Sequence, residues 1–124
     1  MSIRAPDDHC SPGSLHHVEL WVPDLVRALA EWGWLLGELG YAEFQRWPDG
    51  RSWKLGATYL VVEQSSALTA STHQRTRPGL NHLAFHAGDA ARVDDAGGPA
   101  HYAAYLANSD GYEVELVATV GTQP

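Results

Sequence analysis

Two segments of similar pattern, LHHVELWVPD at residues 15–24 and LNHLAFHAGD at residues 80–89, decide how the chain is expected to fold. In each segment apolar and polar residues alternate, which is typical of a β-strand with one buried face. A Leu, a His and an Asp recur at the same places in both segments, 65 positions apart. Such a repeat predicts two copies of one structural unit joined in a single chain.

The residues after the first segment predict a helix and three further strands. Asp24 is a favourable N-cap, and apolar residues then recur at steps of three and four until Gly40, as in an amphipathic helix. Strands are predicted at residues 41–47, 52–55 and 57–64, with the turn sequence PDGR between the first two. The first copy is therefore predicted to be a βαβββ module.

The second copy is shorter than the first. His17 and Glu63 lie 46 residues apart, whereas His82 and Glu115 lie 33 residues apart. The stretch GDAARVDDAGG leaves room for only a short helix and a loop, and one strand is expected to be missing. The later strands of this copy are predicted at residues 101–107 and 112–118.

The predicted fold class is α+β, with two fused βαβββ modules of which the second is shortened. A polar stretch that ends in Pro and Gly is predicted to be the linker between them. The expected boundaries are a mobile N-terminal tail at 1–13, the first module at 14–64, the linker at 65–79, the second module at 80–118 and a C-terminal tail at 119–124.

Composition excludes several classes of partner. The 15 acidic and 8 basic residues give a formal charge of −7, which disfavours nucleic acids and anionic membranes as partners. No apolar run approaches the ~20 residues of a membrane span. The single cysteine, Cys10, can form no internal disulfide, and a cytoplasmic location is the expectation.

Two histidines and two glutamates occupy related places in the two copies. His17 and His82 match in the opening strands, and Glu63 and Glu115 lie in the closing strands. Two imidazoles and two carboxylates suit one divalent ion such as Zn, Ni, Mn, Co or Fe, with a position left open for substrate. The spacing alone also allows each His to be an ordinary surface residue.

The stretches LHHVELWVPDL, LGELGY, GLNHLAFHAGDA and NSDGYEVELVA resemble the vicinal oxygen chelate superfamily. That superfamily includes glyoxalase I, fosfomycin-resistance enzymes, extradiol dioxygenases and bleomycin-resistance proteins. The resemblance implies a curved, mostly antiparallel sheet around a cavity, with a metal ion held by His17, Glu63, His82 and Glu115. It also implies metal-assisted electrophilic catalysis in which Glu115 or Glu63 serves as general base.

Tryptophans are predicted both in the core and in the site. Trp32 and Trp34 fall in the predicted helix and are expected to pack in the core. Trp21 lies on the face of the first strand that carries the predicted ligand, and Trp47 and Trp53 bracket the PDGR turn. These three are predicted to contact substrate, although filling a small core is an equally good interpretation.

Other polar residues lie near the predicted ligands or outside any pattern. Glu19 and His86 share the ligand face of their strands and are expected either to support substrate and imidazole orientation or to be solvated. His16 should point to the opposite face and be structural. The histidines outside any pattern are predicted to be solvated, namely His9, His73 and His101.

Two functions from different classes remain open. One is a metal-dependent lyase, isomerase or dioxygenase that acts on a small oxygenated molecule. The other is a non-catalytic protein of the bleomycin-resistance type that sequesters an antibiotic or metabolite. Trp21 stands where glutathione-using members carry a carboxylate-binding Arg, so the resemblance implies a substrate other than a glutathione conjugate. Unpaired strand edges of an incomplete second module predict a homodimer.

Overall fold

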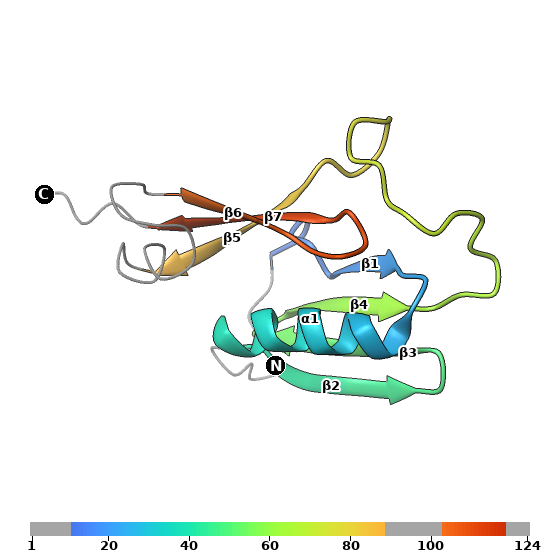
Figure 1. Cartoon of the computed structure of the whole chain (residues 1–124). Coiled ribbons are helices and arrows are strands. Elements are labelled where there is room, and N and C mark those ends of the chain that lie inside the picture. Colours follow the sequence, from blue (N-terminus) through green and yellow to red (C-terminus); the bar gives the residue numbers. More distant parts are fainter. Residues whose placement is uncertain (1–10, 89–102, 119–124) are drawn as a thin grey trace, which may run out of the picture. The chain divides into compact units, whose positions relative to one another are not determined.

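A computed structural model of the chain describes residues 11–88 and 103–118, which form one helix and seven strands. They divide into two compact units, one ending at Ser71 and the other beginning at Thr72, within the predicted linker. The elements are, in chain order, β1 (His17–Trp21), α1 (Leu25–Glu38), β2 (Ala42–Trp47), β3 (Gly50–Leu55), β4 (Thr58–Glu63), β5 (Leu83–Gly88), β6 (Ala103–Ala107) and β7 (Glu113–Ala118), as Figure 1 shows.

The first unit is a four-stranded mixed sheet with α1 along one face (Figure 1). The strand order is β1-β4-β3-β2, with β1 parallel to β4 and the other pairs antiparallel. Alternating residues such as Leu20, Leu60 and Val62 are buried. The residues that alternate with them on the other face of the strands, beginning with His17 in β1, point away from the helix. The predicted βαβββ order of this unit is confirmed.

The helix α1 begins and ends where the sequence predicted. The Asp24 N-cap has an extended backbone, and its Oδ1 accepts a hydrogen bond from the backbone nitrogen of Arg27 at 3.1 Å. Gly40 follows the last turn with a φ of +97°, which glycine adopts without strain. Trp32 is buried as predicted, but Trp34 is 63% exposed, so its assignment to the core is wrong. Two positions along a helix rotate a side chain by about 200°.

No helix in the described part of the chain is long and apolar enough to cross a membrane, α1 having 14 residues.

The second unit is a three-stranded sheet of order β5-β7-β6, in which β5 is parallel and β6 antiparallel to β7. These relations repeat those of β1, β4 and β3, so the internal repeat is confirmed in topology. A counterpart of β2 would fall between β5 and β6, on residues 89–102, which lie outside the described ranges, so the missing strand stays a prediction. The short helix predicted after β5 falls on residues 89–98, outside the described ranges. In β7 the buried residues are Val114, Leu116 and Ala118.

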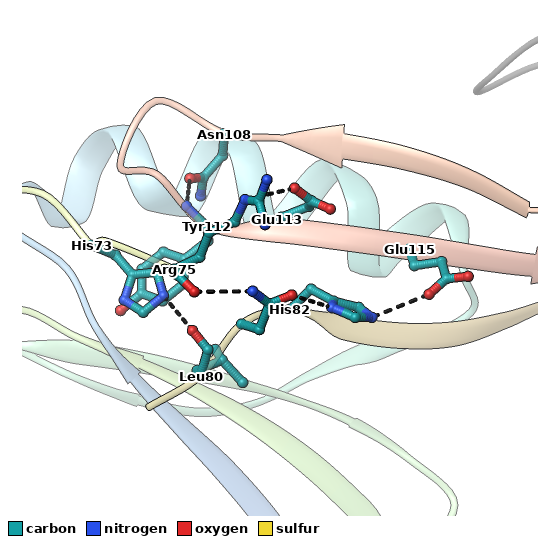
Figure 2. A network of polar contacts seen from close by, with 9 residues as sticks. His73, Arg75, Leu80, His82, Asn108, Tyr112, Glu113 and Glu115 are labelled. Atoms are coloured by element: carbon teal, nitrogen blue, oxygen red, sulfur yellow. Dashed lines mark hydrogen bonds and ion pairs between the residues drawn. The ribbon is translucent and has the colours of Figure 1, made fainter. Parts of the chain in front are cut away.

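A turn between β6 and β7 anchors the segment that precedes β5. Oδ1 of Asn108 accepts hydrogen bonds from the backbone nitrogens of Asp110 and Tyr112, each at 3.0 Å. The backbone nitrogen of His73 donates to the carbonyl of Asp110 at 2.9 Å, and its ring stacks on Tyr112 with centroids 4.5 Å apart. Nε2 of His73 also lies 2.8 Å from the carbonyl oxygen of Leu80 (Figure 2). The prediction that His73 is solvated is therefore wrong.

Candidate functional site

His82 and Glu115, both predicted as metal ligands, contact each other in the second unit. His82 immediately precedes β5, and Glu115 lies in β7 opposite Ala84. Because Ala84 follows His82 by two residues, both positions share a face of the sheet. Nε2 of His82 lies 3.1 Å from Oε1 of Glu115, as Figure 2 shows. The structure thus joins a predicted imidazole to a predicted carboxylate across the first and last strands of this unit.

The side chain of Asn81 holds the His82 ring in this orientation. Nδ2 of Asn81 donates to the backbone carbonyl of Arg75 at 2.9 Å, so its Oδ1 faces the neighbouring imidazole. That oxygen lies 2.8 Å from Nδ1 of His82 and accepts a hydrogen bond from it. In the neutral ring, the lone pair of Nε2 is then directed at Glu115. The sequence pattern did not indicate Asn81, because its partner at Arg75 lies in an irregular segment.

Arg75 also links the segment that precedes β5 to β7. Its Nε lies 3.0 Å from Oε1 of Glu113, which precedes Glu115 by two residues and shares its face. With side-chain exposures of 45% and 20%, this ion pair contributes at most about 1 kcal/mol to stability. Its main effect is to hold Arg75 in place, because the backbone carbonyl of Arg75 accepts the hydrogen bond from Nδ2 of Asn81.

Tyr105 lies beside Glu115 on the neighbouring strand β6, directly opposite it in the register. The negative charge of Glu115, followed by a hydrogen bond with it, raises the pKa of the Tyr105 hydroxyl. The ring of Tyr105 also meets His82 edge-on, with centroids 6.4 Å apart. The hydroxyl therefore stays protonated at neutral pH and is a hydrogen-bond donor beside the carboxylate.

The nitrogen and oxygen atoms that His82 and Glu115 turn toward each other are suitable ligand atoms for a divalent metal ion. Nε2 of the neutral ring and Oε1 are both acceptors, so their contact at 3.1 Å is stabilised by a cation, either a proton or a metal ion. Zinc bonds of ~2.0–2.2 Å to imidazole and carboxylate in tetrahedral geometry place neighbouring ligand atoms ~3.3–3.6 Å apart, so a small outward movement of the two side chains would admit the ion. Within residues 11–88 and 103–118, no three His, Cys, Asp or Glu side chains converge, so His82 and Glu115 are two candidate ligands without a third.

His17 and Glu63, the predicted ligands of the first unit, lie apart on their strands. In the parallel pair of β1 and β4, His17 is opposite Tyr59 and Glu63 is opposite Trp21. The four-residue offset corresponds to about 13 Å at the usual strand rise of ~3.3 Å. His17 instead stacks on Tyr59, with centroids 4.9 Å apart. Its Nδ1 also lies 2.9 Å from Nδ1 of His16, which therefore does not point to the opposite side as predicted.

The strand registers make Val61, rather than Glu63, the counterpart of Glu115. In the second unit the glutamate is opposite Ala84, the residue two positions after the histidine. The matching residue of the first unit is Glu19, and its partner in β4 is Val61. The matching of the two closing glutamates by sequence is therefore shifted by two residues. A metal-ligating role of Glu63 stays a prediction.

Glu63 lies in a row with two tryptophans across the first sheet. The registers align Trp21 with Glu63, Glu63 with Gly50, and Gly50 with Trp47, across all four strands. Cross-strand partners share a face, and this face points away from α1. Trp21 and Trp47, both predicted to contact substrate, therefore flank one carboxylate.

Trp53, which was predicted to wall the same pocket, belongs to the opposite face. It is buried opposite Leu60, and its ring lies beside Gly33 of α1. Gly50 and Trp53 are three positions apart in β3, and residues at odd spacing alternate between the faces of a strand. The assignment of Trp53 to a pocket with Trp47 is therefore wrong, and Trp53 is a core residue.

Glu19 and His86 do not contact an imidazole among the described interactions. Oε2 of Glu19 accepts a hydrogen bond from Nε1 of Trp21 at 2.8 Å, so this glutamate orients an indole. His86 is exposed opposite Val117, four residues after His82. Contact of either residue with substrate stays a prediction.

Comparisons with known proteins agree with this fold. Residues 16–96, more than half of the chain, match the model of the Glyoxalase/Bleomycin resistance protein/Dioxygenase superfamily. The uncharacterized protein YqjT of Bacillus subtilis (strain 168) is 41% identical over 125 residues, covering 84% of this chain and 98% of that protein. The crystal structure of a candidate glyoxalase from Bacillus halodurans is 42% identical, with a TM-score of 0.78, covering 87% and 97% of the two chains.

A more distant structure shares the fold alone. The fosfomycin resistance protein FosX of Listeria monocytogenes, complexed with Mn(II) and sulfate, is 18% identical, with a TM-score of 0.60 over 90% of this chain and 96% of that one. The family match and the relatives above 40% identity are decisive. The chain belongs to the glyoxalase/bleomycin resistance protein/dioxygenase superfamily, also called the vicinal oxygen chelate superfamily.

Proposed function

We propose that this protein is a divalent-metal-dependent enzyme that acts on a small oxygenated molecule, with His82 and Glu115 as metal ligands. The observation that carries the proposal is the 3.1 Å contact between Nε2 and Oε1, with the ring oriented by Asn81. Mn(II) in the Listeria relative supports a divalent ion of this kind. Ligation by the full set of His17, Glu63, His82 and Glu115 stays a prediction, since the first two lie apart in their sheet.

When bound, the ion would supply Lewis-acid stabilisation of negative charge that develops on a substrate oxygen. The chain's own residues would hold and move protons near that oxygen. Glu115 is the proposed general base, with Glu63 as the other predicted candidate. The Tyr105 hydroxyl, hydrogen-bonded to Glu115, would hold that carboxylate in place. Because Trp21 replaces a carboxylate-binding Arg, we propose a lyase, isomerase or dioxygenase reaction that does not use glutathione.

A second candidate function is sequestration without catalysis, as in bleomycin-resistance proteins. The row of Trp21, Glu63 and Trp47 on the face of the first sheet opposite α1 favours it, because indole rings bind flat or cationic ligands. The two functions differ in whether ligand is turned over and whether a metal ion is required.

Metal loading tests the enzyme proposal. The chelator-treated protein, incubated separately with Zn, Ni, Mn, Co and Fe(II) and then exchanged into metal-free buffer, should retain one of them near stoichiometry by mass spectrometric metal analysis. The loaded form should then convert a small oxygenated compound in a substrate screen, and the stripped form should not. Retention of none of the five metals would contradict the proposal.

We also propose a homodimer in the cytoplasm. In the described sheets, β1 and β2 are the edge strands of the first, and β5 and β6 are those of the second. Exposed edges favour pairing with another chain. Light scattering during size-exclusion chromatography should give twice the chain mass of 13.5 kDa at micromolar concentration. A mass of one chain would contradict the dimer.

A further inference from the structure

The row of Trp21, Glu63, Gly50 and Trp47 has features that the metal proposal does not use. Glu63 is the central carboxylate, and its two cross-strand neighbours are Trp21 on one side and Gly50 on the other. Gly50 has no side chain, so the side chain of its own cross-strand partner, Trp47, can occupy the space beside the carboxylate. The row lies entirely within the first unit, on the face opposite α1.

Contacts fix the two indoles of this row. A Cβ atom at Gly50 would overlap the Trp47 ring, with Nε1 only 2.7 Å away, so the indole covers the glycine that is opposite Glu63. The indole of Trp21 is held through its Nε1, which donates to Glu19 at 2.8 Å. Trp21 is nevertheless 39% exposed. Two indoles therefore flank one carboxylate, and the indole of Trp21 is exposed.

Charge on this face is separated along the strands. Glu19 and Glu63 lie toward one end, next to Trp21. Lys54 lies toward the other end, with Nζ 4.7 Å from the centre of the Phe44 ring. The nearby Arg51 does not neutralise the acidic end, because it is opposite Val62 and belongs to the helix side of the sheet. It pairs there with Glu43 at 2.9 Å. The end of the face around Glu63 therefore favours a positive ligand group.

We propose that Trp21, Glu63 and Trp47 form a binding site for an alkylated ammonium group of a small organic molecule. Indole faces attract such cations, and a carboxylate between them supplies the opposite charge. Indoles are not metal ligands, so this combination suits an organic cation better than a metal ion. The site goes beyond the proposed function, since it needs no metal and no residue of the second unit.

A pair of probes of equal shape tests the site in the full chain without metal. Choline carries a trimethylammonium group, and 3,3-dimethylbutan-1-ol carries a neutral tert-butyl group in its place. Calorimetry should show choline binding at least about tenfold more tightly than the alcohol. Equal binding of the two probes, or no binding of choline, would overturn the proposal.

Variants separate the local carboxylate from the overall charge. Glu63→Gln should weaken choline binding about tenfold and leave the alcohol unaffected. Glu38→Gln, at the exposed end of α1, changes the net charge equally and should leave choline binding unchanged. An equal loss of choline affinity in both variants would mean that only the overall charge of the protein acts on choline, and it would overturn the site. Loss of bound metal from Glu63→Gln would also overturn it, because Glu63 would then be a metal ligand.

Gly50→Ala tests the position of the indole. The backbone of Gly50 lies outside the left-handed region, so alanine is tolerated there, but its Cβ must displace the Trp47 ring. Choline affinity should fall about threefold to tenfold, with a shift in tryptophan fluorescence that reports the moved ring. Unchanged choline binding with a shifted emission spectrum would remove Trp47 from the site. Since the choline measurements need no metal, their failure leaves the metal proposal untouched.

Discussion

Replacing His82 with alanine should lower the affinity of the protein for its divalent ion by more than about 100-fold. Partners that merely orient a ligand are worth 10–100-fold in metal affinity, and His82 is proposed to be a ligand itself. The change removes Nε2, the atom that lies 3.1 Å from Glu115, and leaves the carboxylate alone. Calorimetric titration of the chelator-treated protein with the retained metal measures the loss, and thermal melting confirms that the variant folds.

Two neighbouring variants show whether this loss is specific. Asn81→Ala removes the acceptor for Nδ1 of His82 and should cost about 10–100-fold in affinity, whereas Asn81→Asp keeps an acceptor and should cost less. His86→Ala should leave most of the affinity, because His86 lies about 13 Å along the strand from His82 at a rise of ~3.3 Å. Equal losses from His82→Ala and His86→Ala, or none from His82→Ala, would disprove the assignment.

The internal repeat and the family resemblance predicted His82 and Glu115, and the alternation of apolar and polar residues put each of them on a polar face. Alternation states which face a residue occupies, and both residues occupy the polar face. It does not state which residues of two strands are opposite each other, since backbone pairing between distant segments sets the register. For this reason Glu63 was matched to Glu115, although the structure puts Val61 there.

Tryptophan positions show the same limit in another form. The helical period placed Trp32 in the core, and the same period, applied to a residue two positions later, turns Trp34 outward. Trp47 and Trp53 are close in sequence, but the residues of β3 alternate between faces, so Trp53 is buried against α1. The sequence allowed a pocket and a small core equally for these tryptophans, and strand alternation decides that Trp53 belongs to the core.

The periodicity of the sequence could not predict the contacts of residues that lie outside helices and strands. Asn81 and His73 are fixed by hydrogen bonds to the backbone carbonyls of Arg75 and Leu80. Such bonds follow the course of an irregular segment, which no repeating pattern encodes. That segment nevertheless orients the proposed ligand, so the stability of its attachment to the turn before β7 bears directly on metal binding.

Gly111→Ala should test that attachment through stability, with a decrease of about 2–4 kcal/mol in the free energy of unfolding. Gly111 has a φ of +91°, which alanine adopts only with strain. A Cβ there would also overlap the carbonyl oxygen of His73. The carbonyl of His73 cannot move away easily, because the backbone nitrogen of His73 donates a hydrogen bond to the carbonyl of Asp110 and its ring stacks on Tyr112. Urea denaturation followed by circular dichroism measures the change.

Gly88→Ala is the matched control, since Gly88 has a similar φ of +86° but, among residues 11–88 and 103–118, no atom within 4 Å of an added Cβ. It should carry only the backbone strain, about 1–2 kcal/mol, so the difference between the variants isolates the overlap with His73. Gly111→Ala should also weaken metal binding, because the displaced segment carries Asn81 and His82, whereas Gly88→Ala should not. If the two variants lose equal stability, the carbonyl of His73 moves aside freely. The segment before β5 is then not held by the turn, and the orientation of His82 rests on Asn81 alone.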